Sequence, residues 1–203
     1  MTSLNPILSI TLFATLLAAS GARAQEPPMW LFGDVSFPSR VDTFKALGAE
    51  VSLDGPRGTA LHYGTPMAPR ATVDVIVQPL PGGRDDPEVV RQEFQRTLEE
   101  LERYTGNGRD RVSVSVDTVR AVSVEAGGWT FQGHVAEATV RGGGGRAGRT
   151  LAYVFAKPPS FVKIRITHAP AFKDELDPRI HTFVREILTR MESFQDRRTS
   201  GGT

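Results

Sequence analysis

The clearest pattern in the chain is a strict alternation of apolar and polar residues in segment 161–168. The alternating positions are Val162, Ile164 and Ile166 on one side, and Lys163, Arg165 and Thr167 on the other. A period of two places successive side chains on opposite faces of a strand. We therefore predict a half-buried strand whose polar face carries Lys163 and Arg165, about 7 Å apart along the strand.

Other segments show the same period or a short apolar run, and each is expected to form a strand. They are residues 60–64, 72–78, 112–117 and 129–135. Segment 151–155 is apolar on both alternating faces, which predicts a central strand covered from both sides. Residues 30–37 are expected to form a short strand or extended arm, and residues 44–47 to lie against an edge of the core. Trp129 and Phe131 are expected in the core, since alternating aromatic residues on a strand are usually buried; stacking on a ligand is the alternative.

Two further segments carry apolar residues at helical spacing. The first runs from Pro87 to about Tyr104, and the second begins at Asp177 and Pro178. An acidic residue followed by proline is a good helix start, because the carboxylate caps free amide groups and proline fits the first helical position. Each helix is expected to lay an apolar stripe on a sheet. The stripes are Val90, Phe94, Leu98 and Leu101 in the first helix, and Ile180, Phe183, Val184, Ile187, Leu188 and Met191 in the second.

The N-terminal segment has the features of a secretion signal. An apolar run over residues 7–19 precedes Ala22-Arg23-Ala24, the small-x-small pattern of a cleavage site. The run is shorter than the roughly 20 residues that span a bilayer. We therefore predict cleavage after Ala24; an uncleaved anchor is the alternative, because no lysine or arginine precedes the apolar run. Amino-terminal sequencing of the exported protein is expected to begin at Gln25, and an intact N-terminus would contradict export with cleavage.

The order of elements predicts a single α+β domain. We expect a mainly antiparallel sheet of about six to seven strands with two main helices packed on it. The expected organisation is a signal peptide over residues 1–24, one domain over residues 25–196 and a disordered tail over residues 197–203. The location is expected to be periplasmic or secreted, with no stable membrane span after cleavage.

Composition narrows the classes of partner. The 203 residues include no cysteine, which excludes disulfides, thiolate metal ligands and a lipid-modified cysteine. The chain has 24 Lys and Arg against 23 Asp and Glu, and loss of Arg23 with the signal makes the numbers equal. A neutral chain with intermixed charges is not expected to bind nucleic acid. The expected partner is an envelope protein or a small ligand.

Several segments together carry a family resemblance. They are residues 128–139, 151–155 and 161–167, followed by the final amphipathic helix ending near Phe194. In the order of their elements and in their pattern of apolar residues, these segments resemble the PsbP/Mog1-like group of α-β-α sandwich proteins, and in particular small exported bacterial proteins of that shape. The resemblance covers about half of the chain after the signal. It implies an accessory or binding protein without a common active site, so no catalytic residue is transferred.

The histidines show no arrangement typical of a metal site or of acid–base catalysis. They are His62, His134, His168 and His181. None has ligand spacing to another, so we predict no metal and no cofactor. His134 and Glu137, three apart on a strand, are expected on opposite faces. Asp177 and His181 lie four apart on a helix; Asp177 is expected to cap that helix, and an acid–base pair is the alternative.

The glycine run at residues 142–148 invites comparison with a phosphate-binding loop. It lacks the lysine followed by Ser or Thr of that motif, and it lies between strands instead of opening a helix. We expect a mobile hairpin loop. The alternative is a loop that touches an anion through Arg141, Arg146 and Arg149.

The candidate ligand- or partner-binding residues are Lys163, Arg165, Asp74 and His134. Lys163 and Arg165 would together receive one anionic group on an open sheet face. The alternative is that they only face solvent or pair with Asp74, Asp117 or another strand carboxylate. If the anion site exists, changing both cations to glutamine is expected to leave the fold intact and to abolish capture of the partner or ligand.

Two hypotheses for the function follow. The first is a non-catalytic exported accessory or binding protein that acts through a sheet face or loop. The second is an enzyme whose active-site residues are scattered over several strands. A deep pocket with two or more convergent titratable groups would favour the enzyme, and a shallow polar surface would favour the binding protein.

Overall fold

A computed structural model describes residues 28–52, 58–103, 112–142 and 147–193. The expected cleavage site and the expected tail lie outside these ranges. The elements in chain order are β1 (Met29–Phe32), β2 (Val35–Pro38), β3 (Arg40–Val41), β4 (Phe44–Ser52), β5 (Gly58–Gly64), β6 (Ala71–Pro79), the short 3-10 helix η1 (Pro81–Gly83), α1 (Pro87–Arg103), β7 (Ser113–Ala126), β8 (Trp129–Arg141), β9 (Ala147–Lys157), β10 (Ser160–His168), the 3-10 helix η2 (Pro170–Phe172), α2 (Lys173–Arg190) and β11 (Glu192–Ser193).

The strands form one large antiparallel sheet and one small one. Within the described ranges, the large sheet has eight strands in the order β3-β4-β5-β6-β10-β9-β8-β7, and β1, β2 and β11 form a three-stranded sheet beside it. The α+β class and the antiparallel sheet are confirmed. The expected six to seven strands were too few for two reasons. Strand β3 has only two residues, which leaves no alternation to detect. Residues 44–47, expected only to lie against an edge of the core, belong to the nine-residue strand β4.

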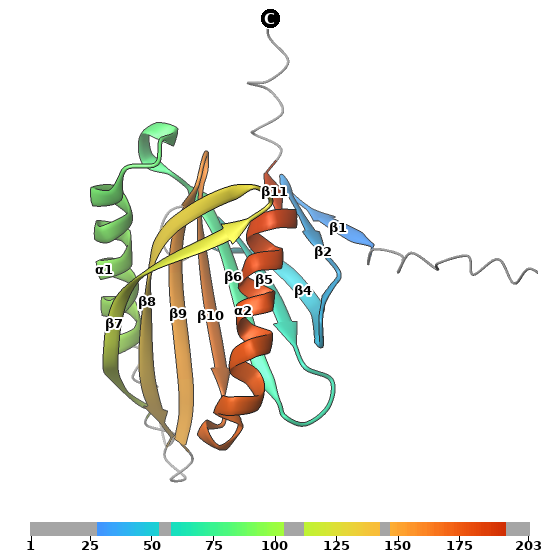
Figure 1. Ribbon diagram of the computed structural model, residues 1–203, viewed down its shortest axis with the longest axis vertical. Helices are drawn as coiled ribbons and strands as arrows, with labels where there is room; N and C mark the ends of the chain where they lie inside the picture. The colour runs from blue at the N-terminus through green and yellow to red at the C-terminus, as the bar shows by residue number, and fades with distance from the viewer. Residues whose placement is uncertain (1–27, 53–57, 104–111, 143–146, 194–203) are drawn as a thin grey trace, which may run out of the picture.

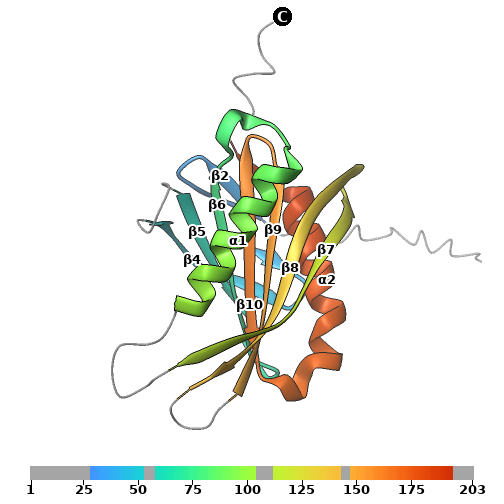
Figure 2. The same cartoon turned by 90° about the vertical axis from the view of Figure 1, so that its left-hand side faces the viewer.

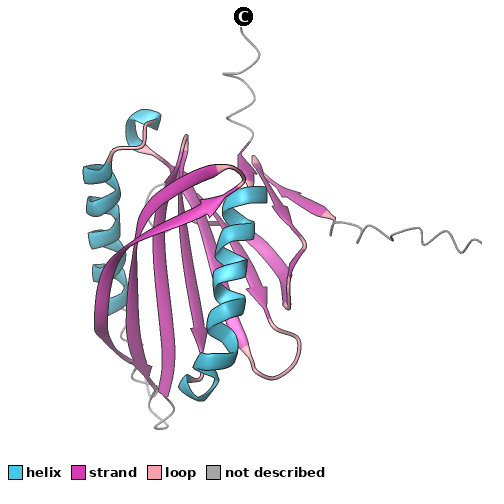
Figure 3. Ribbon diagram, in the orientation of Figure 1, coloured by secondary structure: helices cyan, strands magenta, loops and turns pink. Residues whose placement is uncertain are grey.

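The two main helices lie on opposite faces of the large sheet, as Figures 1 and 2 show from perpendicular directions. Helix α1 contacts β7, β8 and β9, while α2 packs against β7, β10 and the N-terminal strands β2 and β3. Figure 3 makes the three layers plain, with helix on each side of the strands. The arrangement is an α-β-α sandwich.

The larger hydrophobic core lies between the sheet and α2. The apolar side of β10 takes part in it as predicted, with Val162, Ile164 and Ile166 at most 1% exposed. Phe183 of α2 is fully buried at its centre. Its ring centroid lies 4.8 Å from that of Phe44. The predicted apolar stripe of the closing helix is therefore confirmed as core.

A second, smaller core lies beneath α1. Its buried members are Leu80, Val90, Phe94, Ala136, Val154, Ala156 and Phe161. Segment 151–155 of β9 is buried at every position, because α1 covers one of its faces and the main core the other. The prediction of a central strand is confirmed.

The two helix starts differ in how well they were predicted. At α1, Asp86 Oδ1 accepts a hydrogen bond of 2.9 Å from the Glu88 backbone N–H, so this carboxylate caps the helix as expected. Helix α2 begins at Lys173, one turn before the expected start, and Pro178 lies inside it. The interpretation of Asp177 as a cap was wrong: η2 leads directly into the helix, and the Asp177 carboxylate contacts Arg149 instead.

The β7–β8 hairpin corrects the prediction for Trp129. The turn consists of Gly127 and Gly128, whose φ angles of 57° and 81° suit glycine. Trp129 directly follows this turn, at the end of the hairpin, and is 74% exposed. Phe131, two residues further along β8, is partly buried against the main core. The alternation predicts which face of the strand Trp129 lies on. It does not show that the turn, and Trp129 with it, lies beyond the core.

Candidate functional site

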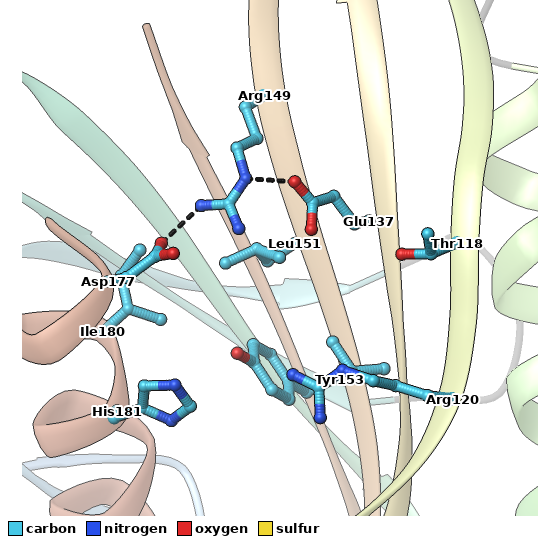
Figure 4. Close-up of a pocket in the computed structure, with 10 residues that line it drawn as sticks. Thr118, Arg120, Glu137, Arg149, Leu151, Tyr153, Asp177, Ile180 and His181 are labelled. Carbon is cyan, nitrogen blue, oxygen red and sulfur yellow. Dashed lines mark hydrogen bonds and ion pairs between the residues drawn. The ribbon is translucent and has the colours of Figure 1, made fainter. Parts of the chain in front are cut away.

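A small hollow lies between α2 and the part of the sheet formed by β7, β8 and β9 (Figure 4). It offers about 40 Å³ to the centres of water-sized molecules, which is room for about three waters. The lining residues are Thr118, Arg120, Val135, Glu137, Arg149, Leu151, Tyr153, Asp177, Ile180 and His181.

The strand register brings the sheet side of the hollow together. Arg120 pairs across to Val135, which pairs in turn with Tyr153. One step along the strands, Thr118 pairs with Glu137. Cross-strand neighbours point to the same face, so residues far apart in the sequence form one wall, and α2 provides the opposite wall.

Arg149 stands at the centre of a partly buried polar network in this hollow. Its Nε donates to Glu137 Oε1 at 2.5 Å, and its Nη1 donates to Asp177 Oδ1. The same Nη1 lies 3.2 Å from His168 Nε2, while His168 Nδ1 lies 2.9 Å from the carbonyl oxygen of Ala169. A carbonyl only accepts, so we assign the imidazole hydrogen to Nδ1 and let Nε2 accept from Arg149.

The network fixes the charges around the hollow. The hydrogen bond from Arg149 holds the pKa of Glu137 below its usual value, against the opposing effect of burial. Burial lowers the pKa of Arg149, but hydrogen bonds to Glu137 and Asp177 outweigh it and raise the pKa overall. Burial also raises the pKa of the Tyr153 phenol. At neutral pH the hollow therefore presents a bound carboxylate at Glu137 and a protonated phenol.

Lys163 does not lie on an open face, which corrects the predicted anion site. It is 5% exposed and forms an ion pair with Glu93 of α1. The physical reason is that α1 packs over this part of the polar face of β10. The ammonium group is thus already paired with a carboxylate beneath the helix, and it does not project into solvent beside Arg165.

Arg165 and Asp74 form the ion pair that was the stated alternative. Arg165 Nη2 and Nε lie 2.6 and 3.1 Å from Asp74 Oδ2. Asp74 Oδ1 also lies 2.9 Å from His62 Nδ1, and His62 Nε2 lies 3.4 Å from Glu50 Oε1. Burial raises the pKa of Asp74, but the hydrogen bonds from Arg165 and His62 outweigh it and the net pKa is lowered. These charges satisfy one another along a row of partly exposed side chains.

His134 lies beneath α1 and apart from Asp74 and Arg165. Its ring stacks on Phe94 with centroids 5.1 Å apart and an interplanar angle of 25°. Glu137 points to the opposite face, into the hollow, as the strand spacing predicted. The four candidate residues therefore do not form one site, since Lys163 and His134 are covered by α1.

The remaining candidates from the sequence meet in or near the hollow. Arg149 turns inward from the glycine run and is fully paired, so it is not available to an anion held by the loop; residues 143–146 lie outside the described ranges. Asp177 and His181 both line the hollow, yet no hydrogen bond joins them in the described part of the chain. Tyr153 and Arg120 were not predicted as site residues. The available signal was their register with Glu137 on adjacent strands.

The described residues include neither a metal-binding cluster nor a membrane-spanning helix. In those ranges no group of three or more His, Asp or Glu side chains has the arrangement to hold a metal ion. None of the helices found there is long and apolar enough to cross a membrane.

Comparison with solved structures supports a fold assignment. The structure is similar to the solution structure of cyanobacterial PsbP (CyanoP) from Synechocystis sp. PCC 6803, with a TM-score of 0.50 and 12% identity over 87% of this chain and 98% of that one. The chain has a PsbP-like fold. A likeness at this identity shows the fold alone.

A second similar structure is PA94 from Pseudomonas aeruginosa, described as a putative regulator. Its TM-score is 0.42 and its identity 11%, over 78% of this chain and 93% of that one. No family model matches the chain, and no curated protein matches it in sequence. The likeness to cyanobacterial PsbP supports the fold that the sequence resemblance indicated, while the function has to be argued from the site.

Proposed function

We propose that this protein is a non-catalytic, exported accessory protein that binds its partner or ligand in the hollow between α2 and the sheet. The observation that carries the proposal is the convergence of Arg120, Tyr153 and His181 on one concave surface. A concave site with a few convergent polar groups is the usual form of a binding site. Export rests on the N-terminal sequence.

The enzyme hypothesis has partial support from the same hollow, because several titratable groups converge there. The small volume of the hollow and the lowered pKa of Glu137 argue against it. The available volume is about 40 Å³, and the hydrogen bond from Arg149 lowers the pKa of Glu137, which makes this carboxylate a weak general base. Asp177 is held by the same guanidinium. We therefore favour binding over catalysis.

An NMR titration tests the proposal. Small acidic, basic and neutral compounds are added to the ¹⁵N-labelled protein, and chemical-shift changes are expected to gather on β7, β8, β9 and α2 around the hollow. Thr118→Trp, on the rim, is expected to abolish these changes by filling the space. Val119→Trp is the matched control, because Val119 is 50% exposed on the other face of the same strand, and it is expected to preserve them.

Two results would contradict the proposal. Shift changes centred on Asp74 and Arg165 would move the site to the opposite sheet face. Conversion of any added compound to a product, lost in Thr118→Trp and kept in Val119→Trp, would favour the enzyme.

A further inference from the structure

We infer that the hollow binds a single carboxylate group, held by Arg120 with help from Tyr153 and His181. This inference rests on the proposed function and names its ligand class. Figure 4 shows Arg120 extending from β7 toward Tyr153, with His181 facing them from α2. The three side chains come from different elements and border one space.

The first step concerns which polar groups remain open. Arg149 uses its guanidinium on Glu137, Asp177 and His168. In contrast, neither Arg120 nor Tyr153 makes a hydrogen bond or ion pair with any residue in the described ranges. Tyr153 is 2% exposed as a whole residue, but its hydroxyl oxygen is not among the fully buried unpartnered atoms of the described residues, which are Thr43 Oγ1 and Gln78 Oε1. The hydroxyl group therefore reaches the space of the hollow, where it can donate to a ligand atom or to water.

The second step concerns the group that the open donors can receive. The lining holds the cations Arg120 and Arg149 and the carboxylates Glu137 and Asp177. Arg149 binds both carboxylates directly. Arg120 acts on Glu137 only through its charge, which lowers the pKa of that carboxyl, so its guanidinium donors stay open within the described ranges. A guanidinium presents paired donors that fit the two oxygens of a carboxylate. The phenol O–H and an imidazole N–H are further donors, so the complementary group is an anionic acceptor.

The third step compares the size and charge of a carboxylate with those of a phosphate group. Space for about three waters in 40 Å³ matches a carboxylate, which has three heavy atoms, more closely than a larger phosphate group. The carboxyl groups of Glu137 and Asp177 line the same space. They repel a dianion more than a monoanion. Both arguments favour a carboxylate over phosphate.

The test is an NMR titration of the full protein with sodium acetate, with sodium chloride to hold the ionic strength constant. Acetamide, the neutral analogue of the same shape, and sodium phosphate are titrated in parallel. Acetate is expected to give saturable shifts at Arg120, Tyr153 and His181, and acetamide and phosphate much weaker ones. Arg120→Gln is expected to weaken acetate binding by about tenfold or more, and Tyr153→Phe by a smaller factor.

Arg84→Gln is the matched control. It removes the same charge from an exposed arginine in the link to α1, outside the hollow lining, and it is expected to leave acetate binding unchanged. Equal shifts with acetate and acetamide, or unchanged acetate binding in Arg120→Gln, would overturn the inference. If acetate fails while another compound in the wider titration still binds in the hollow, the ligand class is wrong and the proposed function stands.

A further arm distinguishes the source of the carboxylate. A short acetylated alanine peptide with a free C-terminus is compared with its C-terminal amide. Selective binding of the free acid form supports a carboxylate at the end of a partner chain. Acetate binding with exclusion of both peptides supports a free small acid, and absence of binding by acetate and both peptides overturns the inference.

Discussion

Phe183→Ala is expected to destabilise the fold by about 3 to 5 kcal/mol, measured as the free energy of unfolding in urea. The side chain is fully buried, and its ring lies 4.8 Å from that of Phe44 and 5.1 Å from that of Tyr63. Truncation removes the aromatic contacts and leaves a cavity where α2 meets the sheet. Neighbouring side chains fill such a cavity only in part, which is why the cost exceeds the transfer energy of the ring.

The same change on the other face provides the comparison. Phe94 is 3% exposed beneath α1, and Phe94→Ala is expected to cost about 3 to 5 kcal/mol as well. Val119→Ala is the control at a 50% exposed position, with an expected change within about 0.5 kcal/mol. A loss under about 1 kcal/mol in both phenylalanine variants would mean that the two helices are not docked on the sheet.

The sequence was most informative where periodicity and burial coincide. The alternation in segment 161–168 predicted the core side of β10, and the stripe around Phe183 predicted the buried face of α2. Both signals depend only on the spacing of apolar residues, which strand and helix geometry convert directly into a face. Segment 151–155 was placed centrally for the same reason.

The polar side of β10 could not be predicted in the same way. Alternation assigns Lys163 and Arg165 to one face but does not say what covers that face. In the structure, Lys163 lies under α1 and pairs with Glu93, while Arg165 remains 42% exposed at its side chain and pairs with Asp74. The difference depends on where a helix 60 residues or more away in the chain comes to rest, which is tertiary information.

The hollow was not predicted because its members come from four elements. Arg120, Glu137 and Tyr153 meet through the register of three strands, and Asp177 reaches Arg149 only because α2 starts one turn earlier than its proline suggested. Local sequence cues made Asp177 a cap and Arg149 a loop residue. Those interpretations fit each residue alone, and they fail because each residue has a long-range partner.

The second large effect is expected at the buried ion pair of Lys163 and Glu93. It distinguishes Lys163 from Arg165, two cations that the alternation places on the same face. Lys163→Met is expected to cost about 3 to 5 kcal/mol of unfolding free energy, because it leaves the Glu93 carboxylate buried without its main partner. Glu93→Leu is expected to cost at least as much. The reason is that Glu93 keeps a second partner in Arg96 at 3.1 Å, whereas Lys163 keeps only Glu100 at 3.9 Å.

The double variant Lys163→Met/Glu93→Leu is expected to recover most of the loss, since apolar residues of similar volume replace both charges and neither is left unpaired. Arg165→Gln serves as the control, with an expected loss of about 1 kcal/mol or less for a partly exposed pair. Urea unfolding of the five proteins, wild type included, completes the double-mutant cycle and its control. Additive losses in the double variant would show that Lys163 and Glu93 are not coupled. A loss of about 1 kcal/mol or less in Lys163→Met as well as in Arg165→Gln would contradict the assignment of Lys163 to the interior and return both cations to one open face.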